Sequence, residues 1–150
     1  RLGRVGSGLA VLAVAAAAAD IAWTPARVAL LVVTPLAGAV IFAAVFVATS
    51  TVAFWLVDGA EIANSVTYGG NYLSSFPFTV FGRWLRRFFT FVVPAAFIAY
   101  LPTLALLGRP DPLGMPGWAT WSAPLVALLA AAVAGLVWRA GVRHYVGAGS

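Results

Sequence analysis

Few residues of this 150-residue sequence are of types that could do chemistry. Asp58 and Glu61 stand three positions apart at the end of a long apolar run, where they could form a proton-relay pair, since carboxylates in a membrane are costly and often functional. The same position and spacing also fit a helix-capping signal or a partner-docking contact. His144 follows Arg143 near the C-terminus without a nucleophile motif elsewhere, so we interpret it as a tail residue and not as part of a triad.

The composition excludes several kinds of site. All nine basic residues are arginine, so the chain has no lysine for a Walker A loop, and any ATP hydrolysis must occur on another polypeptide. Cysteine is absent and histidine occurs once, which excludes thiolate metal sites and zinc centres with several imidazoles. We therefore expect no catalytic residues, no metal site and no cofactor, and we do not expect an enzyme. A lipid-modifying membrane enzyme would need a cluster of polar residues, and the sequence shows none that is convincing.

The composition places the chain in a bilayer. Hydrophobic residues make up 63% of it and charged residues 9%, and the mean hydropathy is +0.99. A soluble domain of this length could not bury so much apolar surface in its core. The net charge of +5 comes from arginines that flank apolar runs, which indicates membrane topology and not nucleic-acid binding.

Apolar runs and the polar residues between them predict the fold. We expect an all-α integral membrane protein whose single transmembrane domain, residues 1–150, is a bundle of four transmembrane helices. The spans are approximately Val5–Trp23, Val28–Val57, Phe88–Leu107 and Trp118–Trp138. The second is longer than a bilayer requires, and its Thr49-Ser50-Thr51 cluster marks where it reaches an interface. A cytoplasmic, amphipathic interfacial segment is expected between the second and third spans.

The arginines orient this model. With both termini in the cytoplasm, seven of the nine arginines lie inside, and only Arg27 and Arg109 lie outside. Residues 108–117, with the sequence GRPDPLGMPG, then form a short proline-rich external turn. The junction of Arg83, Arg86 and Arg87 with the third span meets the cytoplasmic headgroups.

Prolines and small residues add structural predictions. Helix kinks are possible at Pro35, Pro94, Pro102 and Pro124, and they would serve either as movable walls of a transporter or as ordinary features of a rigid bundle. Small residues at four-residue spacing provide a helix-packing face, within the chain or toward a second copy: Ala127, Ala131 and Gly135.

Two stretches carry a family resemblance. They are FWLVDGAEIANSVTYGGNYLSSFPFTVFGRWLRRFFTFVVPAAFIAYLPTLALLGR, residues 54–109, and WRAGVRHYVGAGS, residues 138–150. With nearly the whole chain, they resemble the permease subunits of ABC-2-type ABC transporters, the bacterial ABC-2 family transporter proteins. Such permeases are generally six-span subunits that dimerise and pair with a separate cytoplasmic ATPase. The resemblance implies that these four spans are the C-terminal portion of such a permease, and that the chain is a fragment.

The resemblance implies a transport function. We expect a transmembrane permease subunit of an ABC exporter in the bacterial cytoplasmic (inner) membrane, with ATP bound by a separate ATPase subunit. Expected partners are that ATPase, a second permease copy or a homologous permease, and membrane lipids, but no nucleic acid. The candidate ATPase-facing residues are Asp58, Glu61, Arg83, Arg86 and Arg87, and anchoring in the inner leaflet explains the arginines equally well. The alternative is a small membrane-embedded interaction or assembly protein without transport activity.

Overall fold

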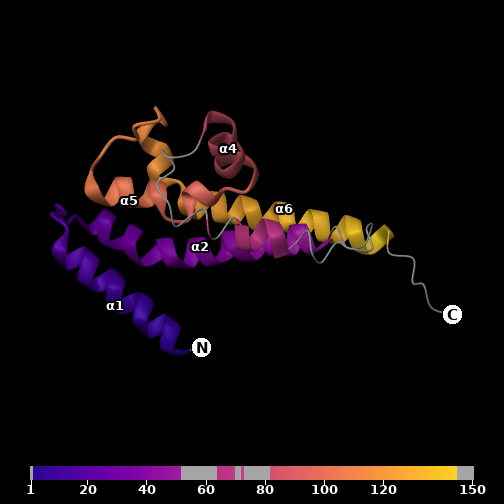
Figure 1. The fold of residues 1–150 in the computed structure, drawn as a ribbon, viewed down its shortest axis with the longest axis horizontal. Coiled ribbons are helices and arrows are strands. Elements are labelled where there is room, and N and C mark those ends of the chain that lie inside the picture. Colours follow the sequence, from indigo (N-terminus) through magenta and orange to yellow (C-terminus); the bar gives the residue numbers. More distant parts are fainter. Residues whose placement is uncertain (1, 52–63, 70–71, 73–81, 145–150) are drawn as a thin grey trace.

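The regular elements in the described part of the chain are helices. The computed structural model describes residues 2–51, 64–69, 72 and 82–144, and its helical elements are arranged as Figure 1 shows. Residues 64–69 are helical as well. The predicted all-α class is confirmed. The bounds are α1 (Leu2–Ala18), α2 (Pro25–Thr51), α4 (Arg83–Arg87), the π-helical η3 (Phe88–Val92), the 3-10 helix η4 (Ala95–Phe97), α5 (Tyr100–Leu107), the 3-10 helix η5 (Gly117–Trp121) and α6 (Ala123–His144).

The start of α2 follows from two residues. Thr24 precedes the helix, Pro25 is its first residue, and the Thr24 hydroxyl accepts a hydrogen bond from the backbone N–H of Arg27 at 3.3 Å. A threonine cap satisfies a free N–H of the first turn, and a proline at the first position has no N–H to leave unsatisfied. The helix then continues through Pro35 to Thr51.

Hydroxyl groups near the C-terminal end of α2 bond back to the helix. Thr49 Oγ1 donates to the Val45 carbonyl at 2.7 Å, and Thr51 Oγ1 donates to the Val47 carbonyl at 2.6 Å. Such bonds satisfy polar groups without water, so this threonine pair is compatible with apolar surroundings as well as with an interface. The end predicted for this span, Val57, lies outside the described residues.

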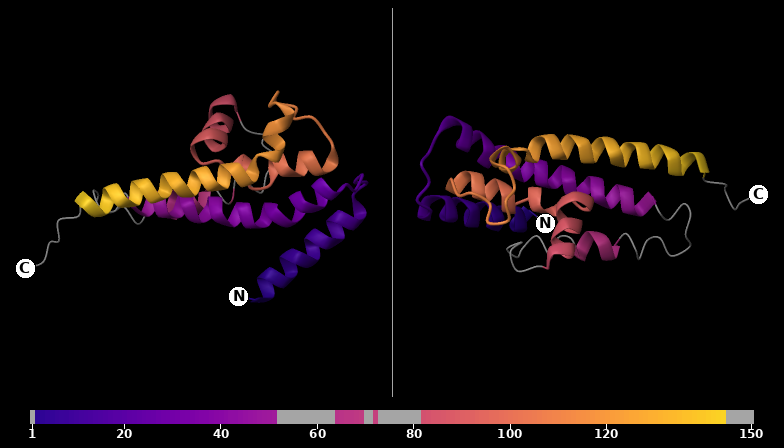
Figure 2. Two further views of the ribbon diagram at one scale, coloured as in Figure 1. Left: turned by 180° about the vertical axis from the view of Figure 1, so that it is seen from behind. Right: turned by 90° about the horizontal axis from the view of Figure 1, so that it is seen from above.

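α2 and α6 pack side by side and run in the same direction, as both figures of the ribbon show (Figures 1 and 2). Near the start of the pair, Ala37 lies in one core cluster with Ala123, and farther along Val47 borders the same groove as Trp138. Residue numbers therefore increase together along the two helices. We call these two helices the parallel pair.

Buried positions in the parallel pair follow a seven-residue repeat, the period of a left-handed helix crossing. Most side chains at these positions are small, which lets the two backbones approach closely. The repeat comprises Ala37, Ala44 and Thr51 on α2, and Ala127, Ala134 and Gly141 on α6, whereas Leu30, one step earlier on α2, packs on α5.

Two helices of the described chain are long and apolar enough to cross a bilayer: α2, and Ala123–Arg143 of α6. At about 1.5 Å per residue, the 27 residues of α2 extend about 40 Å, more than the roughly 30 Å of a hydrocarbon core. The apolar part of α1, Val5–Ala18, is shorter, and α1 diverges from the other helices in Figure 2. Length and composition thus support two spans, or three if the bent segment described next is one span, and the predicted four-helix bundle is not confirmed.

The predicted third span, Phe88–Leu107, is not a continuous helix. α4 and η3 form one arm, Arg83–Val92, and the next arm, Ala95–Leu107, is bent from it by 72°. The break falls at Val93 and Pro94, because proline has no N–H to continue the helix and disfavours helical geometry in the residue before it. The N–H of Val93 bonds instead to the Phe88 carbonyl at 3.2 Å. The predicted span is therefore divided into two arms at Pro94, one of the positions where a kink was predicted.

The second arm returns along α2. Ala95, Ala96 and Leu101 share a core cluster with Ala37 and Ile41, whereas the later residues Ala105 and Leu106 pack on Leu30. α5 therefore runs antiparallel to α2. Just before α5 the chain approaches α2 closely, because a Cβ at Gly38 would lie 3.1 Å from Cγ2 of Ile98 and 3.6 Å from the Ile98 carbonyl oxygen. A small residue at this position of α2 is what allows the contact.

Candidate functional site: apolar grooves beside the parallel pair

One apolar groove lies between η3 and the parallel pair. It has a volume of about 360 Å³ and is lined by residues of α2, η3, η4 and α6, among them Ala44, Phe91, Phe97 and Val133. Thr90, which is 7% exposed, brings a hydroxyl to this otherwise apolar lining. We call this space the η3 groove. Its walls come from both members of the parallel pair, so a change in their separation would change its width.

A second groove lies between α2 and α6. It has a volume of about 490 Å³, and its walls are formed by side chains such as Val40 and Val47 from α2 and Ala131 and Trp138 from α6. Small residues on α6 leave this space open, because alanine and glycine cannot fill the gap between two helices. Both grooves are apolar surfaces of the kind that lipid, another helix or an apolar solute can cover.

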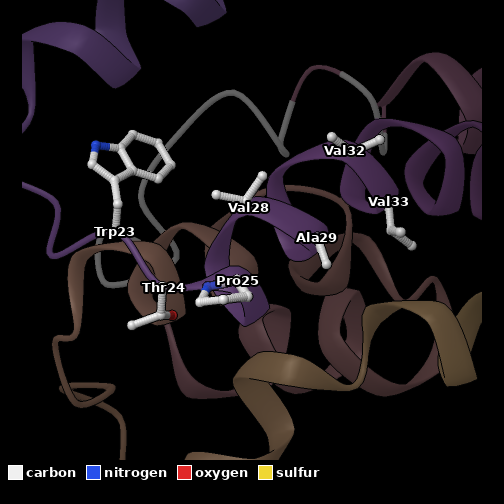
Figure 3. Close-up of a pocket in the computed structure, with 7 residues that line it drawn as sticks. All are labelled: Trp23, Thr24, Pro25, Val28, Ala29, Val32 and Val33. Atoms are coloured by element: carbon white, nitrogen blue, oxygen red, sulfur yellow. The ribbon is translucent and has the colours of Figure 1, made fainter.

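A third depression is only a surface. It lies at the start of α2, with a volume of about 680 Å³, and Figure 3 shows the residues that line it. All of them belong to the short stretch Trp23–Val33, so the depression has no lining residue from a second element of the described chain. A wall supplied by one helix and its linker does not enclose a ligand, and we do not assign a binding site to it.

A buried carboxylate organises the turn between α5 and η5. Asp111 is 8% exposed, its Oδ1 accepts a hydrogen bond from Tyr100 Oη at 2.7 Å, and its Oδ2 accepts one from the backbone N–H of Met115 at 3.2 Å. The Asp111 carbonyl accepts a further bond from the N–H of Gly114 at 3.1 Å, where φ is +81°. The predicted proline-rich turn is thus present, and Asp111 holds it to the start of α5.

Arg27 joins three segments at one end of the molecule. Its Nη1 donates to the Ala22 carbonyl of the α1–α2 linker at 2.7 Å. Arg27 Nη2 lies against Gly108, and a Cβ added to Gly108 would be 2.7 Å from this nitrogen. Gly108 ends α5 in the left-handed conformation, with φ +63°, and its N–H and that of Arg109 bond to carbonyls of the last turn. The backbone conformation of Gly108 therefore favours glycine, whereas the guanidinium, at the end of a flexible side chain, could shift to admit a Cβ.

The candidate ATPase-facing residues are only partly described. Asp58 and Glu61 lie outside the described residues, and for Arg86 only the backbone, within α4, is described. Arg83 and Arg87 line a pocket together with Leu113 and Met115 of the turn that was expected on the other side of the membrane. A straight helix of about twenty residues would separate these groups by about 30 Å, and the bend at Pro94 brings them together instead. Their contact with an ATPase stays a prediction.

The predicted kink sites occupy different positions. Pro35 lies inside α2 and Pro94 at the break between two arms, whereas Pro102 and Pro124 lie in the first turns of α5 and α6. A first-turn proline removes no hydrogen bond from the helix interior, so neither of these two interrupts its helix.

The predicted packing face is divided. Ala127 is buried against α2, whereas Ala131 and Gly135 are exposed and border the groove between the helices. Residues four positions apart on an α-helix are offset by about 40° around the helix axis. A row of such residues therefore turns away from a neighbouring helix that lies straight beside it. The buried residues Ala127, Ala134 and Gly141 instead follow one another at seven-residue steps. Contact of the exposed pair with a second copy stays a prediction.

These features first define a class: a helical membrane protein whose long apolar helices form grooves and whose packing relies on small residues. The family model for the ABC-2 family transporter protein matches residues 1–149, and the chain belongs to that family. This family consists of membrane components of transporters that generally work with an ATPase subunit. No curated protein and no solved structure matches the chain.

Proposed function

We propose that this chain is a permease subunit of an ABC exporter and forms part of its translocation pathway. The family match over residues 1–149 carries the proposal. The structure supports it through the parallel pair, whose two grooves would change width if the helices moved relative to each other. In this proposal the chain holds no cofactor, and ATP is bound and hydrolysed by a separate subunit that binds two states of the permease differently.

We place the proposed ATPase contact on Asp58 and Glu61, in a bacterial inner-membrane protein with cytoplasmic termini. Arg83 and Arg87 are left out of it because they face a pocket of their own chain. The proposed assembly includes a second permease copy or a homologous permease. The exposed apolar faces of α2 and α6 support this, since they include large side chains such as Leu36 and Leu128 that need lipid or protein cover.

The test is co-purification of the chain with a cytoplasmic ABC ATPase subunit from the same cell, followed by measurement of ATP hydrolysis in proteoliposomes. We expect the double variant Asp58→Arg/Glu61→Arg to lose at least tenfold in recovered ATPase and in permease-stimulated hydrolysis, because reversed charge opposes the contact. Asp20→Arg, an exposed position in the α1–α2 linker, is the control and should leave both unchanged. Failure of the unmodified chain to bind the ATPase would contradict the exporter, whereas unchanged binding by the double variant would remove only these two residues from the interface.

Orientation has a separate test, which uses the cysteine-free background. A single cysteine at Pro112 should react with an impermeant maleimide from outside the cell, and one at Gly147 only after the membrane is opened. The reverse pattern would invert the proposed topology.

A further inference from the structure

A pocket on α4 combines positive charge with an apolar wall. Arg83 and Arg87 lie four residues apart, on one face of the helix, and line a space of about 340 Å³ with Thr90, Phe91 and two side chains of the proline-rich turn. Both arginines are exposed. Two guanidinium groups on one face can bind the same phosphate group, since each presents several N–H donors in a planar fork.

The charge in this pocket is not neutralised by the described part of the chain. No described residue forms an ion pair or a hydrogen bond with the guanidinium group of Arg83 or Arg87. Asp111, in the adjoining turn, uses its two carboxylate oxygens on Tyr100 and Met115. Within the described part of the chain, the pocket therefore presents two positive charges that an anionic ligand could neutralise.

The surroundings of the arginines resemble a membrane interface. Trp84 is 76% exposed and stacks on Phe88, with ring centroids 5.8 Å apart, and Phe88 meets Phe89 edge to face at 5.0 Å. Tryptophan beside arginine is typical of the headgroup level of a bilayer, where one end of the side chain is apolar and the other is wet.

The pocket continues into an apolar space. Thr90 and Phe91 line both the arginine pocket and the η3 groove, so the two spaces meet at these residues. A ligand that fills both needs a negative group at one end and a hydrocarbon portion at the other. Inorganic phosphate has only the first of these parts.

We propose that this site binds an anionic phospholipid, with its phosphate between Arg83 and Arg87 and an acyl chain in the η3 groove. Lipid binding here does not depend on the proposed transport function or on an ATPase. The site ties α4 and η3 to the parallel pair through the bound lipid, because the acyl chain would contact residues of α2 and α6.

The test is a native mass-spectrometry titration of the purified full chain in detergent with phosphatidylglycerol. Phosphatidylcholine with the same acyl chains, which is zwitterionic and has no net charge, is the comparison. We expect the apparent affinity for phosphatidylglycerol to fall about fivefold for each arginine replaced, and so roughly twenty-five-fold in Arg83→Gln/Arg87→Gln. Arg83→Lys/Arg87→Lys should bind more tightly than the glutamine variant, because it keeps both charges, but less tightly than the unmodified chain, because it lacks the planar fork.

The matched control is Arg139→Gln/Arg143→Gln, which removes the same net charge from the exposed end of α6. Its affinity should stay within twofold of the unmodified chain. Equal losses in the two glutamine variants would show that the effect is general charge and would overturn the site, as would unchanged affinity in Arg83→Gln/Arg87→Gln. If inorganic phosphate or glycerol phosphate displaced the lipid at comparable concentration, the pocket would be a simple anion site and the lipid assignment would be wrong.

Discussion

Replacing Asp111 with alanine should release the turn at residues 108–117 from α5. The carboxylate accepts a 2.7 Å bond from Tyr100 Oη and a 3.2 Å bond from the Met115 N–H, and only 8% of Asp111 is exposed. A hydrogen bond to a charged group contributes about 1.5–3 kcal/mol, and the longer bond falls at the low end of that range or below it. We therefore expect Asp111→Ala to lower the free energy of unfolding by about 3 kcal/mol and Tyr100→Phe to lower it by about 2 kcal/mol.

The two changes should not add, because each removes the same bond. The double variant is expected to be about as unstable as Asp111→Ala alone, which gives a coupling energy of about 2 kcal/mol. The assay is SDS-induced unfolding of the full chain in mixed micelles, followed by tryptophan fluorescence. Asp20→Ala, in an exposed linker, is the control and should change stability by less than about 0.5 kcal/mol. Additive losses from Asp111→Ala and Tyr100→Phe would refute the reasoning, since the two side chains would then not be bonded to each other.

Three further predictions concern packing. Gly108→Ala should destabilise the protein by about 1–2 kcal/mol in the same unfolding assay, because φ at Gly108 is +63°. An unchanged unfolding midpoint would contradict the left-handed backbone conformation at this residue. Thr34 Oγ1 is buried without a hydrogen-bond partner, so Thr34→Val should raise stability by up to about 1 kcal/mol, whereas Thr51→Val, which loses a 2.6 Å bond, should not raise it. Cysteines introduced at Ala37 and Ala123 should form a disulfide under mild oxidation, because these two residues share a core cluster. Cysteines at Thr51 and Ala123 should not, because Thr51 lies about 21 Å farther along α2. Cross-linking of the second pair alone would indicate that the two helices are antiparallel.

Apolar length was sufficient to predict the two long helices. The run after Thr24-Pro25 carries its own start signal, and the run after Ser122 continues to His144, so local sequence determines both. The third apolar run shows the limit of that approach. Its length fits a span, but Pro94 removes a backbone donor, and hydropathy alone does not say whether neighbouring helices restore a straight path.

Side-chain roles that depend on tertiary contacts were missed. Arg27 was interpreted only as an outside charge, whereas it joins the α1–α2 linker to the end of α5. Asp111 was included only as part of a turn, although an aspartate before a proline in a turn is a local signal for a side chain that bonds to nearby backbone. Its bond to Tyr100 could not be predicted, because eleven positions separate the two residues and the bend of the chain brings them together.

The common direction of α2 and α6 has a consequence for any topology of this chain. If both helices cross the bilayer, residues between Thr51 and Ala123 must traverse it an odd number of times, because each helix starts on the same side. The arm Ala95–Leu107 supplies about 20 Å of that return, less than the roughly 30 Å of a hydrocarbon core, so other residues between the two helices must supply the rest. The C-terminal ends of α2 and α6 then face one compartment, where a single soluble protein could contact both and move them together.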